Sequence, residues 1–208
     1  MKQVFFIDLD NTIYFTKPNK DVLMTGLYDL LDEQNLNIDE QDYQSAKDEM
    51  LRTPFLKVAE KYSFPTKVIQ RTVEYLANRE VVKNLVPSDD YHFIKSLKGR
   101  KFIVTAGFPK QQKSKVKMLG IADDFEEIHV VDISVTNKKQ AFVDLIEKHK
   151  LPKEDILIVG DDAESEIKFG LELGIETFLL DPDNLHPNAK STYTGKDLTQ
   201  LHQAAGQN

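Results

Sequence analysis

The segment Val4-Phe5-Phe6-Ile7-Asp8-Leu9-Asp10-Asn11-Thr12 runs from four apolar residues directly into two aspartates. A continuous apolar run rich in aromatic and β-branched side chains favours a strand that is buried on both faces, as in a parallel sheet covered by helices. In open sheets of this kind, functional groups gather at the carboxyl ends of the strands. Asp8 and Asp10 therefore predict a functional site at the end of the first strand.

Four later runs have the same apolar character and are separated by segments with helical periodicity. They are Phe102-Ile103-Val104, His129-Val130-Val131, Ile156-Leu157-Ile158-Val159 and Thr177-Phe178-Leu179-Leu180. Because strand and helix alternate from about residue 88 to residue 180, the sequence predicts repeated βαβ units. We expect an α/β core with a Rossmann-like parallel sheet, whose helices end near Gly99, Gly120 and Gly174.

The interval between the first strand and Ser88 breaks this alternation. It spans about 70 residues without a strand-like run and carries several helical patterns. We expect an all-helical cap domain over residues 16–86, inserted into a core domain formed by residues 1–15 and 87–208.

Four helices are predicted within this insertion. The first runs through Val22 to Leu31, the second is capped by Asp39, the third has Thr53 as N-cap with Pro54 at its first position, and Pro65 opens the fourth. The basic side chains of the insertion are interpreted mostly as solvated helix faces, although one or two are free to point toward an anionic substrate. They are Arg52, Lys57, Lys61, Arg71 and Arg79.

The end of the chain, after Leu180, is turn-rich and predicts a surface segment with a last short helix near Leu198 to Ala205.

The composition excludes several classes of protein. The chain has 208 residues, of which 27 are basic and 34 are acidic, for a net charge of −7. An acidic balance argues against binding to a nucleic-acid polymer, because phosphates are neutralised by a basic surface. The absence of cysteine excludes disulfides, thiolate nucleophiles and zinc–cysteine sites.

The sequence also predicts a protein that stays in the cytoplasm. No stretch approaches the roughly 18 apolar residues that cross a bilayer, so no membrane partner is expected. The opening Met1-Lys2-Gln3 leads into an apolar block that ends in acid, so we expect no signal peptide.

Polar residues follow the other predicted strands at corresponding positions. The second strand leads to Thr105-Ala106-Gly107, the helix after the third begins near Lys138-Lys139, and the fourth leads to Gly160-Asp161-Asp162. Carboxylate oxygens are the ligands that Mg²⁺ prefers, and a carboxylate can act as a nucleophile. Hydroxyl and ammonium groups bind phosphoryl oxygens. Together these groups indicate phosphoryl transfer.

The same segments, in the same order, resemble the four motifs of the haloacid dehalogenase-like (HAD) hydrolase superfamily. Asp8 to Thr12 matches the D-x-D-x-T signature, and Thr105 resembles the second motif. Lys138, with Phe142 four residues later, resembles the third, and Gly160 to Glu166 resembles the acidic fourth. The position of the insertion resembles the cap of one large branch of the family. The first motif, continued by Ile13-Tyr14, is similar to that of pyrimidine 5′-nucleotidase-like phosphatases.

The resemblance implies a role for each residue that matches a motif. Asp8 would be the nucleophile and a Mg²⁺ ligand, and Asp10 the general acid and base, with its backbone carbonyl a further metal ligand. Thr105 would bind the phosphoryl group, Lys138 would offset charge around the nucleophile, and Asp161 would anchor the metal. Because dehalogenases of this family lack the second acid, Asp10 favours a phosphatase or phosphomutase.

Three departures from the family pattern leave alternatives open. Lys138 is followed by Lys139, and we prefer Lys138 for its spacing to Phe142. The last acid of the fourth motif is Glu166 in place of the common Asp, so Asp162 could instead contact metal-bound water.

The third departure concerns the phosphate pocket. Ala106 stands where many relatives have Asn, so we expect the Gly107 backbone to make one phosphate contact. The phosphate-binding candidates are Thr105, Ala106, Gly107 and Lys138.

The sequence as a whole predicts a Mg²⁺-dependent phosphatase that hydrolyses a small phosphorylated metabolite, a nucleoside monophosphate or a sugar phosphate, through an aspartyl-phosphate. The alternatives are a phosphomutase of the same family and a non-catalytic HAD-like protein that binds a ligand or has a regulatory role. We expect a monomer or a weak homodimer.

Overall fold

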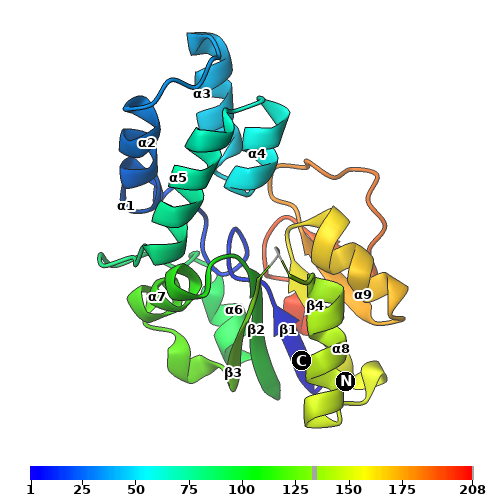
Figure 1. The fold of residues 1–208 in the computed structure, drawn as a ribbon. Coiled ribbons are helices and arrows are strands. Elements are labelled where there is room, and N and C mark those ends of the chain that lie inside the picture. Colours follow the sequence, from blue (N-terminus) through cyan, green and yellow to red (C-terminus); the bar gives the residue numbers. More distant parts are fainter. Residues whose placement is uncertain (133–134, 208) are drawn as a thin grey trace.

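The computed structural model of the chain describes residues 1–132 and 135–207. Six strands form one parallel sheet in the order β3-β2-β1-β4-β5-β6 (Figure 1). The chain builds the sheet outward from β1 in one direction and then restarts at β4 in the other. This is the Rossmann-like arrangement that the sequence predicts. The strands are β1 Val4–Ile7, β2 Arg100–Ala106, β3 Glu127–Val131, β4 Ile156–Gly160, β5 Glu176–Leu180 and β6 Tyr193–Gly195.

The sixth strand corrects the prediction of surface turns after Leu180. Thr177 and Thr192 each donate a backbone N–H to the hydroxyl of the other at 3.1 Å. These paired bonds bring the chain alongside β5, where Phe178 pairs with Tyr193. The strand β6 has only three residues, two of which are exposed, so the sequence contains no apolar run that would predict it. The last predicted helix is present as α10, Leu201–Ala204.

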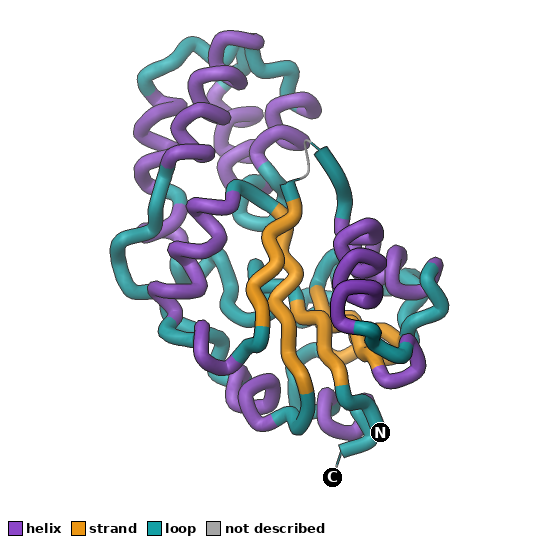
Figure 2. Tube along the Cα trace, turned by 60° about the horizontal axis from the view of Figure 1, so that its bottom comes forward, coloured by secondary structure: helices purple, strands orange, loops and turns teal. Residues whose placement is uncertain are grey.

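Both faces of the sheet are buried, as the continuous apolar runs predict. Phe6 of β1 stacks on Phe142 with ring centroids 5.5 Å apart, on the face covered by α8 and α9. Phe5 and Ile7 point to the opposite face, which α6 and α7 cover (Figure 2). Burying each such side chain contributes about 1.5–3 kcal/mol. These helices are α6 Tyr91–Ser96, α7 Pro109–Leu119, α8 Lys138–His149 and α9 Lys168–Glu172.

Five helices fill the interval between β1 and α6. They lie over the carboxyl ends of the strands, at the end of the sheet opposite the two chain termini (Figure 1). No helix in the described ranges is long and apolar enough to cross a membrane. The five are α1 Lys20–Leu23, α2 Thr25–Asp32, α3 Glu40–Glu49, α4 Phe55–Lys61 and α5 Thr66–Asn78.

Local chemistry explains where these helices begin. Asp39 caps α3 as predicted, because its side chain accepts the N–H of Asp42 at 2.8 Å. The first predicted helix is instead two, since Met24, with φ −109°, separates α1 from α2. The N-cap of α4 is Pro54 rather than Thr53. The Pro54 carbonyl accepts the N–H groups of Lys57 and Val58 in the first turn. Proline is tolerated here because the N–H of an N-cap residue has no partner within the helix.

The two chain segments that lead into and out of this helical group are tied together. The buried Asn19 side chain donates to the carbonyls of Phe15 at 2.9 Å and Val86 at 3.2 Å, and it accepts the Val86 N–H at 2.9 Å. The N–H of Ser88 donates to the Ile13 carbonyl. These contacts lie close to residues 16 and 86, where the sequence predicts domain boundaries, and the boundaries stay a prediction.

Candidate active site

The two central strands deliver the first two acids of the site. The N–H of Asp8 donates to the Val159 carbonyl at 2.9 Å, which extends the β1–β4 ladder by one residue. Asp161 follows β4 immediately after Gly160. Because Ile7 pairs with Val159 in the parallel register, Asp8 is level with Gly160, and Asp161 follows one residue later at the same edge of the sheet.

A third acid, Glu166, completes a group of carboxylates. Oxygen atoms of Asp8, Asp161 and Glu166 all lie within 4.8 Å of one another. Glu166 comes from a π-helical turn, Ala163–Ile167, and is almost completely buried. Its carboxylate accepts the N–H of Asp162 at 2.9 Å, which fixes the side chain against the end of β4.

Lys138 is the cation of this group. Its Nζ lies 2.6 Å from Asp8 Oδ1 and 2.7 Å from Glu166 Oε2. Asn137 caps α8 by accepting the N–H of Gln140, which places Lys138 at the first helical position. The alternative, Lys139, lies at the surface and pairs with a different acid. The structure therefore brings the preferred lysine, Lys138, to Asp8.

The charges of this group shift its pKa values in a consistent direction. Burial is the main cause that raises the pKa of Asp8 to about 7, and the carboxylates of Glu166 and Asp10 add to it against the opposing charge of Lys138. Burial, Glu166 and Asp8 also hold the pKa of Asp161 well above its usual value. Three carboxylates share one buried ammonium, so the group lacks positive charge.

This donor set fits Mg²⁺, which takes oxygen ligands and is held by carboxylates. Asp8, Asp161 and Glu166 would hold the ion. Asp162, a predicted ligand, is directed elsewhere because its Oδ1 accepts the N–H of Glu164 at 2.9 Å and caps the π-helical turn. Gly160 makes room for Glu166, since a Cβ at residue 160 would lie 2.5 Å from Glu166 Cγ.

Asp10 has a separate set of partners on the other side of β1. Lys115 Nζ lies 2.7 Å from Asp10 Oδ1, Gln112 Nε2 lies 2.7 Å from Oδ2, and the Tyr14 hydroxyl donates to the same carboxylate. Burial would raise the pKa of Asp10, but the charge of Lys115 and these hydrogen bonds outweigh it and lower the pKa below its usual value. The contacts favour the ionised carboxylate.

Thr105 lies beside Asp10 through a shared partner. Its buried hydroxyl accepts from Gln112 Nε2 at 2.6 Å, and the same amide lies 3.2 Å from the Ala106 carbonyl. Gly107 corrects a prediction, because its N–H donates to the Val131 carbonyl at 3.0 Å and is not directed to a phosphate. With φ +143° and the Gln112 side chain packed close to its Cα, residue 107 favours glycine for backbone geometry and space.

One basic side chain from the helical group reaches the carboxylates. Arg52, in the turn between α3 and α4, lies 3.6 Å from Asp161 Oδ2 and 2.9 Å from Asp183 Oδ2. The neighbouring Leu51 carbonyl accepts the Asn11 side-chain N–H at 3.4 Å. The same turn therefore contacts both the loop that carries Asp10 and the carboxylate group, through Asp161.

Sequence reasoning missed Gln112, Lys115 and Tyr14. A signal for the first existed, because Gln112 stands four residues before Val116 and seven before Leu119, in line with the buried face of α7. A polar residue at such a position needs a buried partner. The contact of Arg52 with Asp161 had no sequence signal beyond its positive charge.

Comparison with protein families matches residues 2–174 to the haloacid dehalogenase-like hydrolases. The chain belongs to this family. The matched range contains every residue of the site described above except Asp183. A comparison with curated proteins gave no match for this HAD-like hydrolase.

Solved structures share the fold along almost the whole chain. The HAD-hydrolase YfnB from Bacillus subtilis, solved bound to magnesium, is 21% identical with a TM-score of 0.69, and 98% of each chain is covered. A HAD phosphatase from Thermococcus onnurineus is 18% identical with a TM-score of 0.64, covering 99% of this chain and 98% of that one. A 2-haloacid dehalogenase from Pseudomonas syringae is 13% identical with a TM-score of 0.59 and 99% coverage of each chain. At these identities the similarity shows the fold, which phosphatases and dehalogenases share.

Proposed function

We propose that this HAD-like hydrolase is a Mg²⁺-dependent phosphatase that acts on a small phosphorylated metabolite, a nucleoside monophosphate or a sugar phosphate. The observation that carries the proposal is the second acid, Asp10, which lies two residues from Asp8, is partly buried and has its own donors. Cleavage of a phosphate ester leaves an alkoxide oxygen that needs a proton. Release of a halide needs none, so Asp10 favours ester hydrolysis over dehalogenation.

Asp8 acts as the nucleophile in the first step. One of its oxygens forms a bond to phosphorus while the bond from phosphorus to the ester oxygen breaks, which gives an aspartyl-phosphate. Asp10, in its acid form, donates a proton to the departing oxygen. Its contacts with Lys115 favour the ionised form in the substrate-free protein, and the approach of an anionic phosphate opposes that effect.

Water completes the reaction in the second step. Asp10 accepts a proton from the water as the water oxygen bonds to phosphorus, and the bond from phosphorus to Asp8 breaks. Phosphate leaves and both carboxylates return to their starting forms. Magnesium held by Asp8, Asp161 and Glu166 would supply the positive charge that lets several carboxylates lie beside an anionic substrate.

Two further residues orient the phosphoryl group. The Lys138 ammonium lies against the nucleophile and offsets charge there, and the Thr105 hydroxyl is available to donate to a phosphoryl oxygen. The helices α1–α5 lie over the site and would exclude water while Asp8 is phosphorylated.

Phosphate release from a panel of nucleoside monophosphates and sugar phosphates tests the proposal. We expect turnover that requires Mg²⁺, stops with EDTA, and falls by about 10⁴-fold or more in Asp8→Asn. Asp144→Asn is the matched control, because Asp144 is an exposed aspartate of α8 that bonds only to Gln140 among the described residues.

Three outcomes would contradict the proposal. Turnover that survives in Asp8→Asn would mean that Asp8 is not the nucleophile. Transfer of the phosphoryl group back to the substrate, in place of transfer to water, would indicate a phosphomutase. Binding without turnover on the whole panel indicates a ligand-binding relative.

A further inference from the structure

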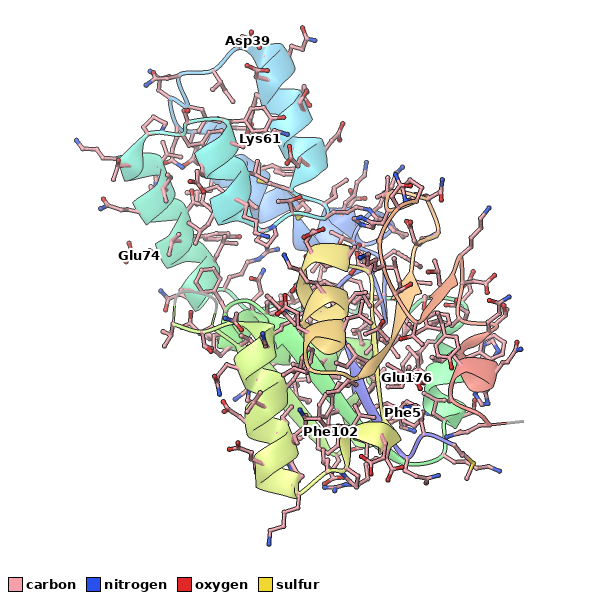
Figure 3. The ribbon with its side chains drawn as sticks, turned by 90° about the vertical axis from the view of Figure 1, so that its right-hand side faces the viewer. Phe5, Asp39, Lys61, Glu74, Phe102 and Glu176 are labelled. Atoms are coloured by element: carbon pink, nitrogen blue, oxygen red, sulfur yellow. The ribbon has the colours of Figure 1, made fainter. Side chains whose placement is uncertain are left out.

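Arg52 is held over the site from outside the α/β core. Asp39 and Lys61, at the outer ends of α3 and α4, lie far from the sheet (Figure 3). The turn that joins these helices is therefore at their inner ends, and Arg52 extends from it to Asp161 and Asp183. Asp161 is largely buried, whereas Asp183 is an exposed residue of the loop after β5.

The ion pair of Arg52 with Asp183 lies at the surface, and we expect it to add little to stability. The Arg52 side chain is 31% exposed and that of Asp183 is 65% exposed. The contact with Asp161, at 3.6 Å, is long for a charge-assisted hydrogen bond. A guanidinium held so loosely beside buried acids can exchange one carboxylate for an anion of a ligand.

The geometry of phosphoryl transfer decides which part of a substrate faces Arg52. The attacking and leaving oxygens lie roughly in line on opposite sides of phosphorus. Asp8 attacks from the end of β1, so the leaving group extends away from the sheet toward the helices that cover it. Arg52 is the basic side chain that those helices bring to a site carboxylate in the described ranges.

We propose that Arg52 binds a second anionic group, carried by the leaving group of the substrate. Its planar guanidinium matches the two oxygens of a carboxylate or of a second phosphate. Asp183 keeps one side of the guanidinium in place while the other turns from Asp161 to the ligand. The inference rests on the proposed phosphatase function. It favours phosphate esters whose leaving group carries a carboxylate or a second phosphate. Esters whose leaving group is neutral, such as nucleoside monophosphates, are disfavoured.

Matched substrate pairs test this specificity. 3-Phosphoglycerate and glycerol 3-phosphate differ by a carboxylate in place of a hydroxymethyl group, and fructose 1,6-bisphosphate and fructose 1-phosphate differ by the second phosphate. We expect kcat/KM of the wild type to favour the charged member of at least one pair by about tenfold or more. The pair that shows the preference identifies the anion as carboxylate or phosphate.

Variants then assign the preference to Arg52. In Arg52→Ala the preference within the pair falls to near unity, mainly through KM, and Arg52→Lys retains part of it because charge remains without the planar fork. Arg71→Ala, which removes an exposed arginine of α5 paired with Glu33, retains the full preference. Equal losses on both members of a pair overturn the inference, because they place Arg52 against the transferred phosphoryl group.

A binding measurement separates this inference from the proposed function. Calorimetric titration of Asp8→Asn with 3-phosphoglycerate and glycerol 3-phosphate, and with the fructose pair, in Mg²⁺ does not depend on turnover. If Asp8→Asn binds the charged member of a pair preferentially, and adding Arg52→Ala abolishes the preference, the inference is supported. This holds even if the wild type hydrolyses no ester, including p-nitrophenyl phosphate. Hydrolysis of p-nitrophenyl phosphate without a preference in either pair overturns the inference and leaves the phosphatase standing.

Discussion

Asp8 and Asp10 are two residues apart on one loop, and their surroundings are opposite. Asp8 lies among two other carboxylates and one lysine, and its pKa is raised to about 7, chiefly by burial. Asp10 is more exposed, at 29% of its side chain against 7% for Asp8. It has Lys115, Gln112 and Tyr14 as donors, and its pKa is lowered. The difference comes from the elements on either side of β1: β4 and its π-helical turn supply acids, and α7 supplies donors.

This contrast shows how one short motif can supply two chemical roles. In such carboxyl pairs the group with the raised pKa is usually the acid. Here the raised pKa belongs to Asp8, the proposed nucleophile, and a bound cation would lower it. Asp8 has excess negative charge that a divalent cation would neutralise. The charge of Asp10 is balanced by Lys115, so Asp10 needs no metal ion. It can therefore exchange a proton with a substrate.

The largest effect that would separate the two aspartates is expected from Asp10→Asn. For an alkyl phosphate, kcat/KM should fall by about 10²–10⁴-fold, because the leaving oxygen loses its proton donor. For p-nitrophenyl phosphate it should change far less, since nitrophenolate leaves without a proton. Steady-state kinetics on both esters measure the difference. Equal losses would mean that Asp10 does not protonate the leaving group.

An intermediate effect is expected from Lys138→Met. The variant leaves Asp8 and Glu166 buried without their ammonium, and we expect kcat/KM to fall by about 10²–10³-fold at saturating Mg²⁺. Lys139→Met is the matched control, since it removes the next lysine of α8 and its surface pair with Glu172. Its activity and melting temperature should stay near those of the wild type. If the two variants behave alike, Lys138 is not the functional lysine.

The smallest effect is expected from Lys115→Met, which tests the Asp10 side alone. Removing the ammonium removes a charge that lowers the pKa of Asp10, so this pKa rises. Because the acid form is needed to protonate the leaving group, activity is lost as pH rises through that pKa. The upper limb of the pH profile of kcat/KM for an alkyl phosphate should therefore move to higher pH. Lys113→Met, on the exposed face of α7, should leave the limb in place, and a shift to lower pH in Lys115→Met would contradict the assignment.

The sequence predicted the parts of the fold that depend on local pattern. Runs such as Val4–Ile7 are buried on both faces, so their apolarity is continuous and their bounds are clear. Glycines such as Gly120, with φ +68°, end helices where expected. β6 was missed because three residues joined to β5 by backbone and threonine hydrogen bonds need no apolar side chains.

The candidate site was predictable where each residue follows a strand or begins a helix. Asp8, Asp161 and Lys138 meet because the register of β1 and β4 and the cap of α8 bring them together. The sequence named both Glu166 and Asp162 for the fourth motif but could not tell which lies beside Asp8 and Asp161. That placement depends on the π-helical turn that carries Glu166. Two of the donors around Asp10, Gln112 and Lys115, come from a helix about 100 residues later in the chain, and spacing alone does not reveal those contacts.

The contacts of Asn19 have a consequence for protein engineering. Because this side chain joins the strand-exit segment at Phe15 to the return segment at Val86, the two chain connections of the helical group lie side by side. A short turn would close the core without it, and the corresponding segment of a relative could be grafted at the same two positions. These two positions thus offer a junction at which the helical group could be exchanged while Asp8, Asp161 and Glu166 stay unchanged.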